Sequence, residues 1–321
     1  MELSLLDRSR TRRGDPDGQA LHDSIARATR AEELGFHRFW VAEHHAVPGI
    51  ASGSPAVLLA AIGQATRRIR LGSGGVMLPQ HQPLVVAEQF RMLEALHPGR
   101  IDLGVGNSLG FTPAVRRALR RETTSPSTFE REIRELRGFL HDDEEVTARP
   151  AVPTIPVHVL ATRSGIEIAA RLALPVVVGG PMVLDAQLPE ILARYRESVI
   201  SHGERPHVIL SLDVFAAASE ERARELALPE AWAMAMSRRT GEFPPLESPE
   251  RILAQPWPGR VRERVDQQLS KVVTGTTGQV VERLRRLADF AEADEIMAST
   301  STFDPSALAD LDAALAHAVG K

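Results

Sequence analysis

The sequence predicts a (β/α)8 TIM barrel that forms one domain over residues 1–321. Eight short apolar runs of strand type are each followed by sequence with helical periodicity, an order that is typical of parallel α/β proteins. A length of 321 residues fits such a barrel with one or two insertions. An open doubly wound sheet is the alternative fold, although such sheets normally contain fewer units.

The individual elements follow from periodicity and from the turn residues between them. Apolar runs predict strands at residues 3–6, 39–42, 69–78, 101–106, 155–161, 175–178, 207–216 and 294–298. Helical periodicity predicts helices at 19–34, 55–65, 83–96, 127–140, 184–201 and 279–291, and further helices that begin near 162, 219 and 304.

Residues 241–259 differ from the rest because they contain five prolines and two glycines. Proline restricts the disorder of a loop, whereas Phe243 and Trp257 need apolar surroundings. We therefore expect an irregular insertion that acts as a lid on the barrel mouth, with Trp257 or Phe243 facing the pocket. A static surface loop whose aromatic residues plug the side of the barrel or a dimer contact is the alternative.

Composition excludes several classes of function. The net charge of −4 provides no basic field for nucleic acid, and the absence of cysteine excludes disulfides, thiolate nucleophiles and cysteine-type zinc sites. We find neither a signal segment after Met1 nor a run of about 18 apolar residues that would span a membrane. We expect a cytoplasmic protein without nucleic-acid or membrane partners.

The helix at 55–65 is apolar on almost every side. One side can pack on the sheet, and the outer side then needs cover from another surface. We therefore expect a homodimer with this helix in the interface; a local cap from elsewhere in the chain is the alternative.

An acid and two imidazoles, Glu43, His44 and His45, follow the predicted strand at 39–42. Because ligands of parallel α/β folds bind at the carboxyl ends of strands, these residues are candidates for an active site. A surface turn that carries polar residues is the alternative. We expect no metal there, since adjacent residues of an extended segment face opposite ways and chelate poorly.

Glycines interrupt the third predicted strand at Gly72, Gly74 and Gly75, although glycine weakens strands. Close approach of a ligand or unusual backbone angles would account for them. The glycines of the fourth strand do not form a dinucleotide fingerprint, because no helix directly follows them.

Five blocks of sequence together resemble the bacterial luciferase-like monooxygenases: Gly35-Phe36, Val41–His45, Arg68–Pro79, His97–Gly106 and Gly275–Val280. The resemblance extends over nearly the whole chain and implies a (β/α)8 barrel that binds reduced FMN, or coenzyme F420 in some branches. Members of the FMN branch often take reduced flavin from a separate flavin reductase and insert oxygen from O2. We expect a small apolar organic substrate, and the most similar subgroup includes enzymes that tailor natural products.

The resemblance also implies roles for individual residues. His44 matches the histidine associated with activity, with Glu43 beside it, and its neutral imidazole can accept or donate a proton near pH 7. The resemblance places a non-proline cis peptide at Gly74-Gly75 against the flavin. The remaining expected cofactor contacts lie at the ends of the third, fourth and fifth strands: Ser73, Gly106, Asn107, Ala161, Thr162, Arg163 and Ser164.

Three departures from the family pattern keep alternatives open. Asn107 replaces a frequent arginine, Ala161–Ser164 replaces a serine-rich phosphate signature, and Gly179-Gly180-Pro181 replaces frequent histidines. A helix start with hydroxyls and Arg163 still suits a phosphate. An F420-dependent oxidoreductase and a non-catalytic flavin-binding or partner subunit are therefore the alternatives to an FMN monooxygenase.

Overall fold

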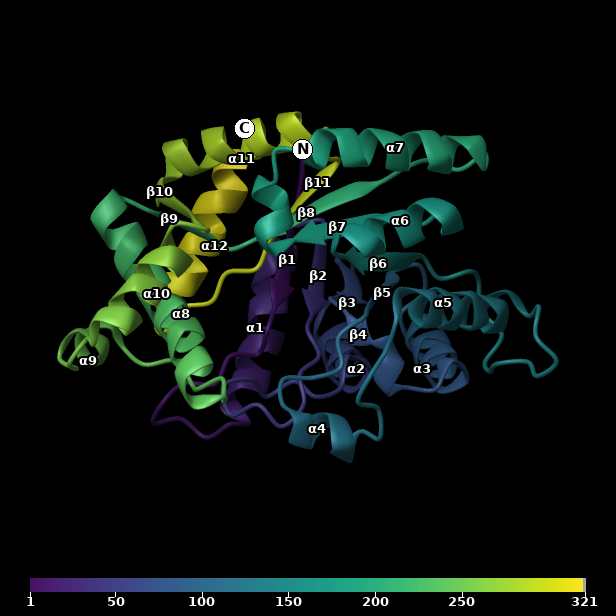
Figure 1. Ribbon diagram of the computed structural model, residues 1–321, viewed down its shortest axis with the longest axis horizontal. Helices are drawn as coiled ribbons and strands as arrows, with labels where there is room; N and C mark the ends of the chain where they lie inside the picture. Colours follow the sequence, from purple (N-terminus) through teal and green to yellow (C-terminus); the bar gives the residue numbers. More distant parts are fainter. Residues whose placement is uncertain (320–321) are drawn as a thin grey trace.

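Eight parallel strands close into a barrel in the computed structural model, which describes residues 1–319 (Figure 1). The order around the barrel is β1, β2, β3, β5, β6, β7, β8 and β11, and β4 continues β3. Their bounds are Glu2–Asp7, Arg38–Val41, Arg70–Ser73, Ile101–Gly106, Val157–Ala161, Val176–Gly179, Val208–Leu212 and Glu295–Ala298, with β4 at Val76–Met77. The predicted (β/α)8 fold is confirmed.

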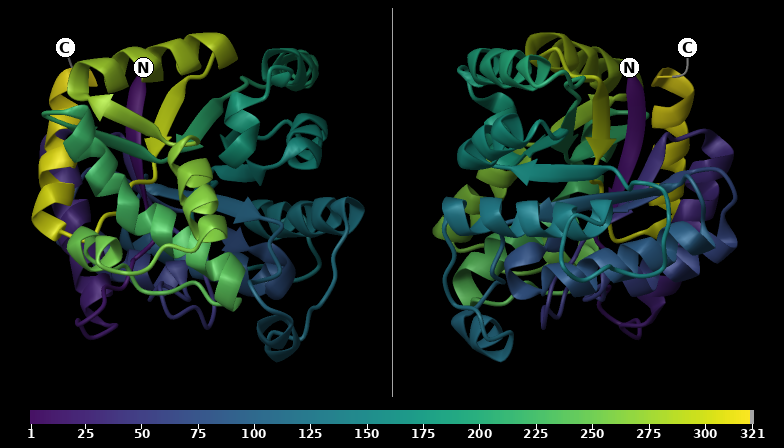
Figure 2. Two further views of the ribbon diagram at one scale, coloured as in Figure 1. Left: turned by 60° about the vertical axis from the view of Figure 1, so that its left-hand side comes forward. Right: turned by 90° about the vertical axis from the view of Figure 1, so that its right-hand side faces the viewer.

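Helices surround this barrel on its outside (Figure 2). They are α1 (Gln19–Leu34), α2 (Pro55–Ala65), α3 (Pro83–Leu96), α5 (Pro126–His141), α6 (Arg163–Leu172), α7 (Leu188–Ser201), α11 (Thr277–Ala291) and α12 (Pro305–Val319). Two short 3-10 segments, η1 (Leu78–Gln80) and η2 (Gly180–Leu184), lie at strand exits. Helix α4 (Pro113–Ala118) falls in a polar stretch for which the sequence indicated no element.

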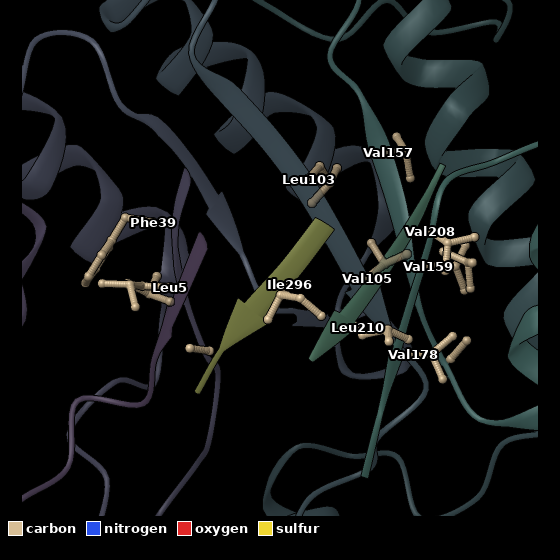
Figure 3. Close-up of a cluster of buried hydrophobic side chains, with 14 of the residues drawn as sticks. Leu5, Phe39, Leu103, Val105, Val157, Val159, Val178, Val208, Leu210 and Ile296 are labelled. Carbon is tan, nitrogen blue, oxygen red and sulfur yellow. The ribbon is translucent and has the colours of Figure 1, made fainter. Parts of the chain in front are cut away.

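The main core lies between the strands and these helices. Leu5, Phe39, Leu103 and Val159 are all 0% exposed, and Ile296 belongs to the same cluster (Figure 3). Alternate residues of the strands point the other way and fill the barrel interior, as the period of two in a strand requires. This second cluster contains Leu6, Trp40, Val177, Ile209 and Met297.

The indole of Trp40 lies in the barrel interior and explains the glycine at position 72. A Cβ at Gly72 would lie 2.5 Å from Trp40 Nε1, whereas one at Gly104 would first meet the backbone oxygen of Ser73, at 2.1 Å. Both contacts are closer than packed atoms tolerate. Close approach of a ligand is therefore the wrong explanation for Gly72, which instead makes room for a side chain of the neighbouring strand.

Buried charges close the amino-terminal end of the barrel. Arg38 lies 2.8 Å from Asp102 and 2.9 Å from Glu295, and both carboxylates have no exposed side-chain surface. His158 packs edge-on against Trp40, with ring centroids 5.1 Å apart. Removing one partner from such a buried network leaves an uncompensated charge, so this end of the barrel serves stability.

The strand predicted at 207–216 is divided in the structure. β8 remains in the barrel, whereas β9 (Val214–Ala217) pairs in parallel with β10 (Val273–Thr276) outside it. Between β9 and β10 lie α8 (Glu220–Thr240), α9 (Pro249–Leu253) and α10 (Gly259–Leu269), which form the left side of the molecule in Figure 1. The segment 241–259 is therefore only partly irregular.

Of the two aromatic residues that the lid hypothesis placed at the pocket, Trp257 packs inside the insertion and does not face the barrel mouth. Its ring packs 5.2 Å from the ring of Trp232 on α8, and its Nε1 donates to the carbonyl of Ile252. It belongs to a small separate core of the insertion together with Val261 and Val265.

Phe243 is 4% exposed and packs with Val47 and Ile50, which follow the histidine pair. Backbone hydrogen bonds fix its segment: Gly49 N–H donates to Phe243 O at 2.8 Å, and Leu246 N–H donates to Thr11 O at 2.9 Å. These contacts favour a static cover over the lid that the sequence suggested.

Candidate active site

Glu43 organises the carboxyl end of β2. Its Oε1 lies 2.6 Å from His45 Nε2 and 2.7 Å from His81 Nε2, and its Oε2 accepts the Met77 N–H at 3.0 Å. Burial alone would raise the pKa of Glu43, but the hydrogen bonds from His45 and His81 lower it to about 2. Glu43 is therefore an anion at neutral pH that holds two imidazoles and the exit of the third barrel strand in place.

The same three side chains have the composition of a metal site, since their donor atoms lie within 4.8 Å of one another. Tetrahedral ligands with bonds of about 2.0 Å would be about 3.3 Å apart. The separations of 2.6 and 2.7 Å between Glu43 Oε1 and the two Nε2 atoms are shorter and match hydrogen bonds. The arrangement therefore fits a hydrogen-bonded triad of Glu43, His45 and His81.

His44 points elsewhere, as adjacent residues in an extended segment do. Its backbone N–H donates to Ser52 O at 2.9 Å, and its buried Nδ1 has no hydrogen-bond partner among residues 1–319. Burial, followed by the charges of Arg8 and Arg10, lowers the pKa of His44 to about 4. The imidazole is consequently neutral at pH 7, and its Nδ1 is left with an unfilled hydrogen-bonding position.

Two arginines that the sequence analysis did not single out define the charge beside His44. Arg8 lies 2.8 Å from Asp213 and 3.2 Å from Glu230, and Arg10 lies 2.9 Å from Glu230. Their position directly after β1 was the available signal, because the first residues beyond a barrel strand surround the mouth.

The peptide bond Gly74-Gly75 is cis, as the family resemblance implied. It follows β3, whose Val41–Ser73 pairing with β2 puts it next to the strand that carries Glu43 and His44. Ser73 is buried, and its hydroxyl donates to Gly104 O at 2.8 Å. This hydroxyl therefore ties β3 to β5 and does not lie at the open mouth.

The remaining predicted cofactor residues lie at the ends of β5 and β6. Gly106 is partly exposed and Asn107 is exposed, whereas Ala161 is 8% exposed and ends β6. Thr162 and Ser164 place two hydroxyl groups 3.5 Å apart at the start of α6. The two strand ends are adjacent because β5 pairs with β6.

Arg163, the first residue of α6, reaches towards the next helix. Its guanidinium donates to Gln187, the residue before α7, and Arg163 itself is exposed. Two hydroxyl groups thus lie at a helix start, which is a suitable environment for a phosphate, and Arg163 adds a positive charge to the same turn although its guanidinium is directed towards Gln187.

His81 is the main residue that the sequence analysis missed. It lies 38 positions from Glu43 and follows η1, not a strand, so no local pattern marked it. The sequence feature that could have indicated a role for His81 is its position three residues after Leu78, where the chain leaves the third barrel strand.

A parallel barrel with ionisable side chains at the carboxyl ends of its strands defines an enzyme-like site. A family model described as luciferase-like monooxygenase matches residues 1–292. The chain therefore belongs to the luciferase-like monooxygenase family, and the resemblance seen in the sequence is confirmed.

Individual relatives agree with this assignment. A luciferase-like monooxygenase of Escherichia coli K12 is 35% identical over 316 residues, covering 95% of this chain and 93% of the relative. An N-acetyl-S-alkylcysteine monooxygenase of Bacillus subtilis 168 is 35% identical over 304 residues, covering 90% and 89%. The crystal structure of apo-MsnO8 has a TM-score of 0.88 at 30% identity and covers 99% of this chain and 98% of that structure. Among residues 1–319, none of the helices combines the length and apolar character needed to cross a membrane.

Proposed function

We propose that this protein is a monooxygenase that uses reduced FMN, supplied by a separate flavin reductase, and O2 to oxygenate an apolar organic substrate. The observation that carries the proposal is His44, which follows the end of β2 next to the strand that leads into Gly74-Gly75, and whose Nδ1 has no hydrogen-bond partner among residues 1–319. The reduced flavin, when bound, supplies the electrons that activate O2.

The residues at the mouth fit a flavin mononucleotide. Arg163 with the hydroxyls of Thr162 and Ser164 would hold the phosphate at the start of α6. His44 would donate or accept a proton at Nδ1 during oxygen transfer, while Glu43 holds the neighbouring His45 and His81 in fixed orientations.

The first test separates the phosphate site from the ring site. Arg163→Gln should weaken the binding of reduced FMN about tenfold, because a charge-assisted hydrogen bond is lost, and should leave riboflavin binding unchanged. Anaerobic fluorescence titration measures both. Equal weakening of the two flavins, or of neither, would place the phosphate elsewhere.

The second test addresses the reaction itself. Reduced FMN with 18O2 and a panel of apolar substrates should give products that carry one labelled oxygen atom, and His44→Ala should lower the yield at least tenfold. A control substitution, His22→Gln on the exposed side of α1, should have no effect. Tight binding of reduced F420 in place of FMN would favour the F420-dependent alternative. Flavin binding without any labelled product would favour the non-catalytic subunit.

We also propose a homodimer in which α2 lies in the interface. Val57 on this helix is 72% exposed, and Met92 and Leu96 on the adjacent α3 are 56% and 57% exposed. Water contact with these apolar side chains is unfavourable by about 25 cal/mol per Å2. Light scattering at micromolar concentration should give the mass of a dimer, and Val57→Glu should give a monomer; a monomeric wild type contradicts the proposal.

A further inference from the structure

A cavity of about 320 Å3 lies on the side of the mouth formed by β7 and β8. Its floor contains Gly179 and Ser211 from the ends of these strands, and its roof contains residues of α8, α10 and α11 from the insertion side. Apolar side chains, including Leu184, Met234 and Leu287, form part of the wall. The volume is within the range of small-molecule sites.

The charges of this cavity are strongly unbalanced. Arg238, Lys271 and Arg283 line it, and none of the three forms an ion pair with any residue in the described range 1–319. The lining also contains Arg8 and a single acid, Asp213, which neutralise each other at 2.8 Å. Arg238 and Lys271 are exposed and Arg283 is half-buried, and three such cations in the lining of one cavity without ion-pair partners attract an anion.

The position of the cavity separates it from the proposed flavin site. Strand β8 is four strands away from β3 in either direction around the barrel, so the cavity lies across the mouth from Gly74-Gly75. Arg8 lines the cavity, and its charge also acts on His44. His44 does not line the cavity, so a molecule held there would need to extend past Arg8 to reach the imidazole, and its head group would not occupy the flavin position.

We propose that this cavity binds the anionic head group, a carboxylate or sulfonate, of a substrate whose remaining body is apolar. Lys271 and Arg283 hold the head group, Arg238 lies at the same wall, and the apolar lining contacts the chain. The role as substrate rests on the monooxygenase function proposed above; binding of the anion is independent of it.

The test is calorimetric titration of the flavin-free protein with 1-octanesulfonate and with the uncharged 1-octanol. We expect the sulfonate to bind at least tenfold more tightly, and each of Lys271→Gln and Arg283→Gln to weaken its binding about tenfold. Arg286→Gln is the matched control, because Arg286 lies on the same helix but pairs at the surface with Glu282. Equal affinity for the two probes, or unchanged sulfonate binding in the two variants, would overturn the proposal.

A second arm adds FMN at saturating concentration to the same titration. Unchanged sulfonate affinity supports two separate sites, whereas competition would assign the three cations to the flavin phosphate and overturn the substrate role. Because no turnover is required, failure of the labelled-oxygen experiment and failure of anion binding are observed separately. With turnover, Arg283→Gln should raise KM for an anionic substrate and leave kcat nearly unchanged.

Discussion

Replacing His158 by leucine should change how the stability of this protein depends on pH. The imidazole is 3% exposed inside the barrel, and its Nδ1 has no hydrogen-bond partner within residues 1–319. Burial lowers the pKa of His158 to about 4; Asp102 acts in the opposite direction, and Arg38 and His207 act with burial. His158 therefore stays neutral in the folded protein at pH values where the unfolded chain already carries it protonated.

The magnitude follows from the two pKa values of His158. A folded pKa of about 4 against an unfolded pKa of about 6.5 corresponds to about 3 kcal/mol of unfolding free energy. Between these values the unfolded state binds more protons, so stability is complete above pH 6.5 and falls as the pH drops towards 4. His158→Leu should remove this loss and, as a volume-conserving exchange, should change stability at pH 7 by less than about 1.5 kcal/mol.

Urea unfolding followed by tryptophan fluorescence at pH 7, 6, 5 and 4.5 measures the effect. The unfolding free energy of the His158→Leu variant should still decrease as the pH falls, but less steeply, because burial also lowers the pKa of His44 to about 4. His22→Gln on the exposed side of α1 controls for the loss of an imidazole. Parallel stability curves for wild type and His158→Leu over this pH range would refute the reasoning.

Three further substitutions test the site, the barrel interior and the outer helix α11. Glu43→Gln exchanges charge-assisted hydrogen bonds for neutral ones, so it should lower the unfolding free energy by about 2 kcal/mol, measured by urea unfolding. It should also lower product formation at least tenfold, measured by mass spectrometry, and wild-type values of both quantities would contradict the role of the triad. Gly72→Ala places a Cβ 2.5 Å from Trp40 Nε1 and should cost about 1–3 kcal/mol, which an unchanged urea midpoint would disprove. Gly278→Ala enters open space in the first turn of α11 and should raise the melting temperature by the equivalent of about 0.5 kcal/mol; a lower value would show an unrecognised contact.

The sequence was sufficient for features that depend on local pattern. Apolar runs such as 39–42 and 101–106 become barrel strands because their alternate residues have two apolar surfaces to cover, the helix layer and the barrel interior. The cis bond at Gly74-Gly75 and the placement of Glu43 and His44 at the mouth came from the family resemblance and from the strand-end rule.

Features that depend on distant partners were not predictable in this way. β8 and β9 read as one apolar run, since a strand that leaves the barrel for β10 has the same local composition as one that stays. The position of Trp257 depends on Trp232 in another helix, and His81 is a partner of Glu43 only after the barrel has closed. Contacts between residues that lie far apart in the sequence cannot be recognised from local pattern, even where each residue is individually notable.

The buried indole of Trp40 forms a rigid floor below the mouth of the barrel. Its indole is 0% exposed among Leu6, Val177 and Met297, and the glycines beside it have no side chains that could move into its space. A barrel in which this indole is trimmed would enclose a chamber that is walled by Leu6, Val177 and Met297 but also exposes Asp102, to which Trp40 Nε1 donates at 3.2 Å, and the ring of His158, so that water would enter it. The fold thus contains a latent binding volume directly beneath its mouth, which one side chain keeps closed.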